Sequence, residues 1–319
     1  MDVMTIVTDR IQEDLERGVV PWRKPWCSVT TGAYNRVTGK SYSVLNQLLL
    51  RHTGEYATYR QWTEAGGQIK RGAESECVVF WKWPDVTKAD DDMVPEGDCG
   101  TDNGSLDPAD HRDRGADYLD HKKSPTLRYY RVFHISQVDG VEPRKREHVY
   151  PTEPIAVAED CLQRYLQREG IRFEADLSDE AYYSPGRDLI HIPSIVQYMP
   201  GAVVNYYATA FHEAVHSTGH VKRLAREGLK HASFGSETYS REELIAEIGS
   251  ACILHSLGID TEETMESTSS YIQGWLSVLN RDKRAIVFSA SQAEKALKYI
   301  MGDMMLMQYP VLFCKSRTS

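Results

Sequence analysis

The sequence predicts an α+β protein of two domains. Its 319 residues exceed what one domain usually holds. Strand-like segments and short helices alternate in the first half, whereas helical periodicity dominates the second. The polar, proline-bearing stretch 141–154 separates the halves and is the expected linker. We therefore expect a small mixed α/β domain over 1–145 and a mainly helical domain over 151–319.

The composition is that of a soluble globular protein, with 41% hydrophobic and 26% charged residues. No apolar run approaches the ~20 residues that span a bilayer, so no membrane partner is expected. The first 18 residues lack the basic–apolar–small order of a signal peptide. The six cysteines are scattered without a CxxC pair, which argues against a zinc ribbon and a disulfide framework. We expect a reducing, cytoplasmic location in a bacterial cell.

The net charge of −9 is distributed unevenly along the chain. Between Asp85 and Lys123 there are 12 acidic and 5 basic residues, in a segment poor in large apolar side chains. We interpret 84–125 as an acidic insertion, because a loop this long inside a domain is functional or disordered. The remainder of the first half is mildly basic, a weak indication of a nucleic-acid partner.

The first half carries helical and strand signals in turn. Apolar residues at helical spacing predict a helix over 4–18, which Gly18 ends. A buried helix is expected within 42–52, and a short one ends at Gly66. The segments 75–83 and 126–138 are rich in β-branched and aromatic residues, so we expect adjacent strands of one sheet, with Phe80 and Trp81 in the core.

The second half is expected to be mainly helical. Two short strands flank the turn Ser184–Pro185–Gly186–Arg187, and the segment RFEAD before them is a further strand. The periodicity of apolar residues predicts the helices, which cover 155–169, 201–219, 241–258, 265–279 and 288–302.

The stretch FHEAVH matches the H-E-x-x-H pattern of zinc peptidases. On a helix, His212 and His216 share one face about 6 Å apart along the axis, so both imidazoles reach one ion. Glu213 lies beside them, where it can take a proton from the attacking water. The preceding AVVNYYATAF is apolar enough to be buried, which suits a site that excludes water. A catalytic zinc site also needs a third protein ligand and one open position.

His220 is rejected as the third ligand. On a continued helix it would lie about 12 Å along the axis from His212, too far for one ion. The longer pattern H-E-x-x-H-x-x-G-x-x-H has its glycine here as Gly219, but Lys222 occupies its last position. We interpret His220 as a surface residue or as one that contacts a metal-ligating side chain.

Glu243 is assigned as the third ligand. It lies in SREELIAEIGSACILHSLG, where Leu, Ile and Ala surround the acidic residues. The alternative is a capping box, in which Ser240 caps the helix and Glu243 is its N3 residue. Glu247 lies one turn deeper and could orient a ligand histidine by a hydrogen bond, although the two roles could be exchanged. Zinc is the expected divalent ion, with manganese or another metal as the alternative.

The N-terminal half interleaves aromatic and basic residues, beginning with PWRKPW at 21–26. Aromatic rings stack on unpaired bases, and Lys or Arg meets phosphates, so this composition is typical of a single-strand binder. The alternative is that several of these aromatic residues fill a small core.

These stretches together resemble the ArdC-type antirestriction proteins of plasmids and phages. In the first half the resemblance rests on GVVPWRKPW, NRVTGKSYSVLNQLLL, TYRQWTEAGGQIKRGAES, CVVFWKW and RVFHISQVDG. In the second half it rests on AYYSPGRDLIHIP, YYATAFHEAVHSTGHVKRL, EELIAEIGSA, YIQGWLSVL and AEKALKYI. It covers nearly the whole chain except the acidic insertion, which has no place in the family pattern.

The resemblance implies a single-stranded-DNA-binding domain followed by a zincin-like metallopeptidase domain. Metal would be held by His212, His216 and Glu243, with Glu213 as general base. The implied role is protection of incoming foreign DNA from host restriction, with a host restriction-system protein as a candidate target. DNA contacts would lie within the N-terminal motifs, where the candidates are Trp22, Arg23, Lys24, Trp26, Lys40, Tyr42, Asn46, Lys70 and Arg71.

Two rival functions stay open. One is a non-enzymatic DNA-binding shield with a purely structural metal, against which the intact Glu213 argues. The other is a DNA-tethered protease that acts on proteins bound to DNA.

Overall fold

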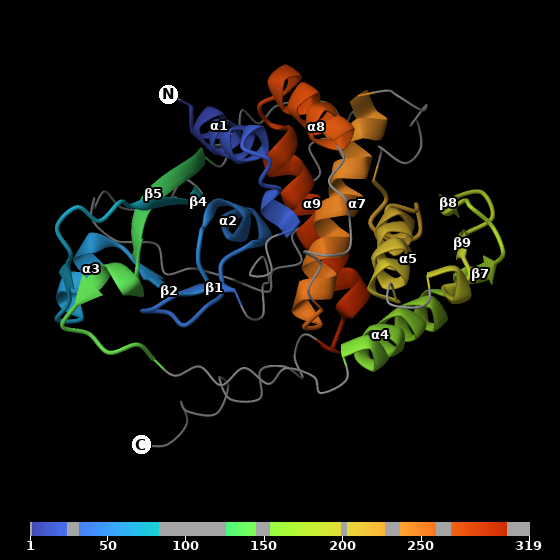
Figure 1. Cartoon of the computed structure of the whole chain (residues 1–319), viewed down its shortest axis with the longest axis horizontal. Coiled ribbons are helices and arrows are strands. Elements are labelled where there is room, and N and C mark those ends of the chain that lie inside the picture. Colours follow the sequence, from blue (N-terminus) through green and yellow to red (C-terminus); the bar gives the residue numbers. More distant parts are fainter. Residues whose placement is uncertain are drawn as a thin grey trace, which may run out of the picture.

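The computed structural model describes seven segments of the chain, which are residues 2–23, 32–82, 126–144, 154–198, 203–226, 237–259 and 269–304. Figure 1 shows a sheet-containing part formed by the first half and a bundle of longer helices formed by the second. The acidic insertion and the DNA-binding candidates Lys24 and Trp26 lie outside the described residues.

The N-terminal part is built on a four-stranded sheet in the order β1-β2-β5-β4. Its predicted pair of adjacent strands is confirmed: β4 and β5 are antiparallel, in register from Glu76 opposite Val132 to Lys82 opposite Thr126. The acidic insertion therefore joins the neighbouring ends of two paired strands. The strands of this part are β1 (Ala33–Asn35), β2 (Gly54–Ala57), β3 (Gln68–Ile69), β4 (Glu76–Lys82), β5 (Thr126–His134) and β6 (Val138–Asp139).

Within its described residues, this part also contains three helices and two 3-10 turns. They are α1 (Val3–Glu16), η1 (Pro21–Arg23), α2 (Val44–Leu49), α3 (Tyr59–Glu64) and η2 (Ile135–Gln137). The Ser43 side chain caps α2, and the Thr58 side chain caps α3 in a capping box with Gln61. The expectation that Trp81 fills the core is wrong, because its side chain is 50% exposed, whereas Phe80 packs on a small core cluster.

The C-terminal part contains a three-stranded sheet and a helical bundle. The sheet has the order β7-β9-β8, with β7 (Arg172–Asp176), β8 (Tyr182–Ser184) and β9 (Leu189–Pro193). The 3-10 turn η3 covers Ile195–Tyr198. The helices are α4 (Pro154–Glu169), α5 (Val203–Thr218), α7 (Glu237–Ser256), α8 (Ser269–Arg281) and α9 (Ala285–Met301). The α+β class is thus confirmed, and in Figure 1 α5, α7 and α9 lie side by side, with the small sheet beyond α5.

One hydrophobic core runs through both halves. Val7, Ile11 and Leu15 of α1 are buried in the same cluster as residues of α8 and α9. Trp22 is fully buried with its ring 5.0 Å from that of Trp275, edge to face. Figure 1 shows α1 against α8 and α2 facing α9. The first half is therefore anchored on the bundle that carries the metal-site motif. Among the described residues, the helices are too short or too polar to cross a membrane.

Candidate metal centre

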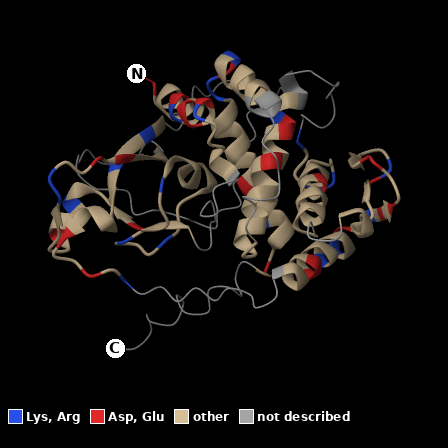
Figure 2. Cartoon of the chain, in the orientation of Figure 1, with Lys and Arg blue, Asp and Glu red and all other residues tan. Residues whose placement is uncertain are grey.

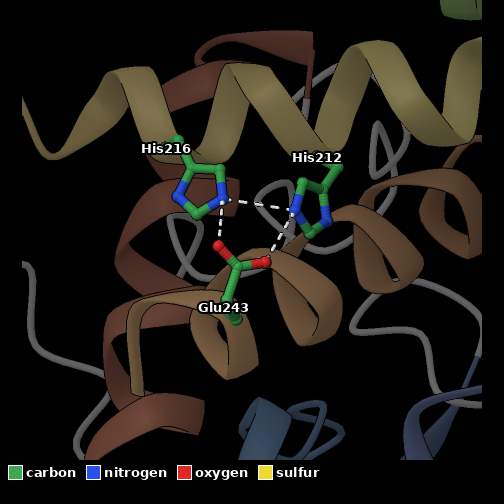
Figure 3. A group of neighbouring side chains, drawn as sticks. All are labelled: His212, His216 and Glu243. Carbon is green, nitrogen blue, oxygen red and sulfur yellow. Dashed lines mark hydrogen bonds and ion pairs between the residues drawn. The ribbon is translucent and has the colours of Figure 1, made fainter. Parts of the chain in front are cut away.

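Two histidines of α5 point to one place in the bundle. This helix has the sequence VVNYYATAFHEAVHST, and Phe211, Ala214 and Val215 on it are buried in the core. Because the helix repeats every 3.6 residues, His212 and His216 lie one above the other on the face toward α7. Figure 3 shows both rings directed at Glu243, which comes from α7.

Three donor side chains converge at this point. His212 Nε2 lies 3.2 Å from His216 Nε2. The two oxygens of Glu243 divide between the rings, with Oε2 3.4 Å from His212 Nε2 and Oε1 3.5 Å from His216 Nε2. Donors bound tetrahedrally at about 2.0–2.1 Å from zinc are roughly 3.3–3.4 Å apart, so these spacings fit a divalent ion. With two imidazoles and one carboxylate as ligands, a four-coordinate ion would have one position left for water or substrate.

The capping explanation of Glu243 is not supported by the start of its helix. The sequence predicted that this helix begins after Ser240, but α7 begins at Glu237, so Ser240 lies inside it. Glu243 is instead placed opposite α5, and Gly249, further along α7, brings the two helices together. A Cβ at Gly249 would lie 2.9 Å from Val215 Cγ2. The close approach of α5 and α7 is what lets one carboxylate reach both rings.

Two further glutamates face the outer nitrogens of the same imidazoles. Glu247 Oε1 lies 4.0 Å from His212 Nδ1, near the ring that the sequence expected it to orient but too far for the proposed hydrogen bond. Glu242 Oε1 lies 3.4 Å from His216 Nδ1 and is buried. The three carboxylates thus contact different ring nitrogens: Glu243 faces the inner pair, while Glu247 and Glu242 face one outer nitrogen each.

The electrostatics of this group favour positive charge at its centre. Burial lowers the pKa of His212, but the hydrogen bond to Glu243 and the charges of Glu247 and Glu213 outweigh it and raise the pKa to about 9. Burial raises the pKa of Glu242, yet contacts with His216 and Arg226 bring it down to about 2. A cluster that keeps Glu242 ionised and attracts a proton to His212 will also attract a metal cation.

The site is partly buried. Glu213 is buried beside His212, whereas the Glu243 side chain is 31% exposed. His220 lies beyond the end of α5, where its Nδ1 accepts a hydrogen bond from the Lys222 amide. Among the described residues, His212, His216 and Glu243 form the group with metal-ligand spacing, without His220.

The described DNA-binding candidates of the N-terminal half fall into a buried group and an exposed group. Trp22, Tyr42 and Asn46 are buried, and Asn46 holds β4 by exchanging hydrogen bonds with the backbone of Val79. These three side chains serve the core, as the alternative interpretation of the aromatic residues anticipated. The basic candidates Lys40, Lys70 and Arg71 are exposed. The backbone of Arg23 belongs to η1.

Sequence reasoning missed Glu242 and Arg226. The Arg226 guanidinium donates to both carboxylate oxygens of Glu242, at 3.1 and 3.2 Å from Nε, and both side chains are 4% exposed. The adjacent acids Glu242 and Glu243 could have indicated two separate contacts. Consecutive helical residues point about 100° apart, so their side chains reach different atoms.

Comparisons with known proteins match both halves. A model of the N-terminal domain of the anti-restriction factor ArdC matches residues 1–133, and a zincin-like metallopeptidase model matches 160–292. The crystal structure of the antirestriction protein ArdC from plasmid R388 in its Mn(II)-bound form is similar, with 29% identity and a TM-score of 0.64. That similarity covers 94% of this chain and 97% of the other. Its metal-free form gives a TM-score of 0.67 at 28% identity, covering 96% and 99%.

Relatives in sequence include proteins of different length. The uncharacterised protein y4eC of Sinorhizobium fredii is 32% identical over 92% of this chain and 90% of its own length. Two proteins of Escherichia coli, each named DNA primase TraC, are 33% and 31% identical over 93% of this chain. The chain spans only 27% and 20% of those two primases.

Proposed function

The chain belongs to the family of ArdC-type antirestriction proteins with a zincin-like metallopeptidase domain, and we propose that it binds single-stranded DNA and holds a catalytic divalent metal. The observation that carries the proposal is the convergence of His212, His216 and Glu243 from two helices at metal-ligand spacing. The proposed division is a DNA-binding domain over 1–145 and a metallopeptidase domain over 151–319.

The proposed reaction is hydrolysis of a peptide bond. The metal, when bound, would polarise the substrate carbonyl and make water more acidic. Glu213, buried next to His212, would take the proton of the attacking water and deliver it to the leaving amine. Zinc suits the two-imidazole, one-carboxylate donor set, and manganese is the alternative, because the similar R388 protein has a Mn(II)-bound structure.

The proposed DNA surface uses exposed side chains of the N-terminal sheet. Trp81 and Tyr129 are 50% and 44% exposed. Val79 pairs with Tyr129 and Trp81 with Leu127, so the two aromatic side chains lie diagonally on the same face of the β4–β5 ribbon. Two exposed rings at this spacing offer stacking surfaces for unpaired bases.

Basic side chains lie beside these rings. Arg131 faces the same side of the ribbon, because it pairs with Cys77, two residue pairs from Tyr129 and four from Trp81, and it donates to Ser75 Oγ at 3.1 Å. Ser75 lines a hollow of about 460 Å³, to which Arg10 and Arg51 also contribute. Figure 2 shows basic positions on this sheet and acidic ones along α7. Together with the exposed Lys40, Lys70 and Arg71, they would meet phosphates.

Titration of the full chain with a labelled single-stranded oligonucleotide at several salt concentrations tests the DNA proposal. We expect affinity to fall as salt rises, because phosphate contacts release counterions. Trp81→Ala should weaken binding by about 1–3 kcal/mol, the worth of one stacked base. Phe288→Ala, which removes a similarly exposed ring (48%) from α9 in the C-terminal bundle, is the matched control. Equal affinity for duplex and single strands, or no effect of Trp81→Ala, would contradict the proposal.

The proposed biological role is protection of foreign DNA from host restriction. Survival of an incoming plasmid or phage in a restricting host tests it, with wild type and Glu213→Ala at equal expression. The variant should retain its metal and its DNA affinity while losing peptide cleavage by about 10²–10⁴-fold. We expect it to retain protection, because a protein that coats a strand needs no turnover. Loss of protection with intact DNA binding would instead identify proteolysis, by a protease tethered to DNA, as the mechanism.

A further inference from the structure

We propose that the buried Arg226–Glu242 pair is a positioning device for His216. It would fix the ring so that Nδ1 carries the proton and Nε2 faces the metal. This inference rests on the proposed metal site and assigns a role to two residues that the motif does not contain. Glu242 is a positioning residue here, while Glu243, its neighbour in the chain, is the ligand.

The first support is the way that Glu242 and Glu243 enclose one imidazole. Glu242 Oε1 lies 3.4 Å from His216 Nδ1, and Glu243 Oε1 lies 3.5 Å from Nε2 of the same ring. An ionised carboxylate only accepts hydrogen bonds, so the nitrogen that faces Glu242 must be the donor. In that tautomer Nε2 has a free lone pair and is directed at His212 and Glu243, as metal binding requires.

The second support is the anchoring of Glu242. Arg226 contacts both of its oxygens and also donates to Thr218 Oγ1 at 2.6 Å and to the Val215 carbonyl at 2.8 Å. These acceptors lie in the last turn of α5, the helix that carries His216. The guanidinium therefore joins the end of α5 to α7 and leaves the Glu242 carboxylate little freedom to turn away from the ring.

The third support is Gly219, which the sequence offered as part of a longer metal motif. A Cβ at this position would lie 3.0 Å from both Cζ and Nη2 of Arg226. The absence of a side chain at Gly219 thus leaves room for the Arg226 guanidinium. This explains the glycine although Lys222, at the last position of the longer motif, is not a metal ligand. The chain turns back here so that Arg226 reaches Glu242.

The contact that Glu247 makes with His212 can be compared with the contact that Glu242 makes with His216. His212 Nδ1 lies 4.0 Å from Glu247, whose side chain is 14% exposed, against 4% for Glu242. A longer contact nearer to solvent constrains a ring less. Glu242 should therefore matter more for metal affinity than Glu247.

The test measures zinc affinity of the full chain by competition with a chelator. Removing one partner would leave the other charge buried, so the main variant is the double replacement Arg226→Met with Glu242→Leu, which removes both charges. The control is Arg223→Met with Asp188→Leu, a partly buried ion pair. Arg223 also contacts the end of α5, through the Ser217 carbonyl, but it holds Tyr183 and Asp188 of the β8–β9 hairpin.

We expect the main double variant to lose about 10- to 100-fold in zinc affinity, the usual effect of removing a partner of a ligand histidine. The control pair should leave the affinity unchanged. Glu242→Gln, which keeps the shape of the side chain, should lose more than Glu247→Gln. Nitrogen NMR of the histidine rings in the zinc-loaded protein supplies a second readout, and in wild type His216 should carry its proton on Nδ1.

The proposal would be overturned if the main double variant unfolds cooperatively and still binds zinc with wild-type affinity. If that variant does not fold, equal affinities of Glu242→Gln and wild type would overturn it instead. A proton on Nε2 of His216 in the zinc-loaded wild type would do the same. Failure of the wild type to bind zinc or manganese would refute the proposed metal site itself, a different outcome.

Discussion

Each candidate histidine faces carboxylates at both ring nitrogens, and the glutamates of α7 divide these contacts between them. Glu243 faces the inner nitrogens of His212 and His216, whereas Glu242 and Glu247 face one outer nitrogen each. The motif H-E-x-x-H and a second acidic helix predicted the inner group from the sequence. The Glu242 contact could not be predicted, because its partner Arg226 lies 16 residues earlier and the pair has no local pattern.

Loss of one inner donor should remove the metal. We expect His212→Ala and His216→Ala to abolish stoichiometric binding of zinc, which elemental analysis of the purified variants would measure. Glu243→Gln should weaken binding more than Glu247→Gln in a chelator competition, because Glu243 reaches both rings at 3.4 and 3.5 Å. The reverse order would mean that Glu247 is the ligand and Glu243 the orienting residue.

Asp188 should make stability depend on pH. Burial raises the pKa of this carboxyl, but hydrogen bonds from Arg223 and Tyr183 outweigh it, so the pKa is lowered in the folded protein. The stabilisation is therefore complete above the unfolded pKa of about 3.9 and is lost as the pH falls through the lower folded pKa. Urea unfolding from pH 6 to pH 3 should show the difference between wild type and Asp188→Asn shrinking below about pH 4. A constant difference over this range would show that the Asp188 charge contributes nothing.

At the scale of elements, the sequence predicted the helices and the three strands of the second half well, but it missed the shortest strands of the first half. Every helix expected in the second half is present, although α7 begins four residues earlier than predicted. The strands β1 and β2 have three and four residues, too few for an alternating pattern. Trp81 was misplaced because strand composition does not say which face of a sheet is covered, and the side chain is exposed.

The close packing of α5 against α7 can be tested with two glycines. A Cβ at Gly249 would lie 2.9 Å from Val215, so Gly249→Ala should destabilise the protein by about 1–3 kcal/mol and weaken metal binding. Gly274 of α8 has open space around it, so Gly274→Ala should stabilise by up to about 1 kcal/mol. Chemical unfolding of both variants measures the effects. Equal stability changes would contradict the helix packing described here.

At the scale of the whole molecule, the two halves share a core although their sequences resemble two domains. Residues of α1 and α2 are buried in one cluster with α7, α8 and α9. Backbone and side-chain contacts also cross between the halves, such as Thr8 Oγ1 donating to the Lys283 carbonyl at 2.6 Å. Charge and linker composition predicted the two domains but could not reveal this interface, which depends on packing between distant segments.

The shared core should make the halves unfold together. Ile11 of α1 is fully buried, so Ile11→Ala should destabilise the protein by about 2–5 kcal/mol. The transition should shift equally whether it is followed by tryptophan fluorescence or by release of bound metal. Val37→Ala, at a 55% exposed position, is the control and should shift neither signal. Two separate transitions, with only one moved by Ile11→Ala, would contradict a common core.

The central claim is that one divalent metal is held where α5 and α7 meet. Anomalous diffraction at the zinc absorption edge, from crystals of the zinc-loaded protein, tests it most directly. One anomalous peak within bonding distance of His212 Nε2, His216 Nε2 and a Glu243 oxygen is the predicted result. A peak at another group of side chains, or no peak at this position in a zinc-saturated crystal, would contradict the account.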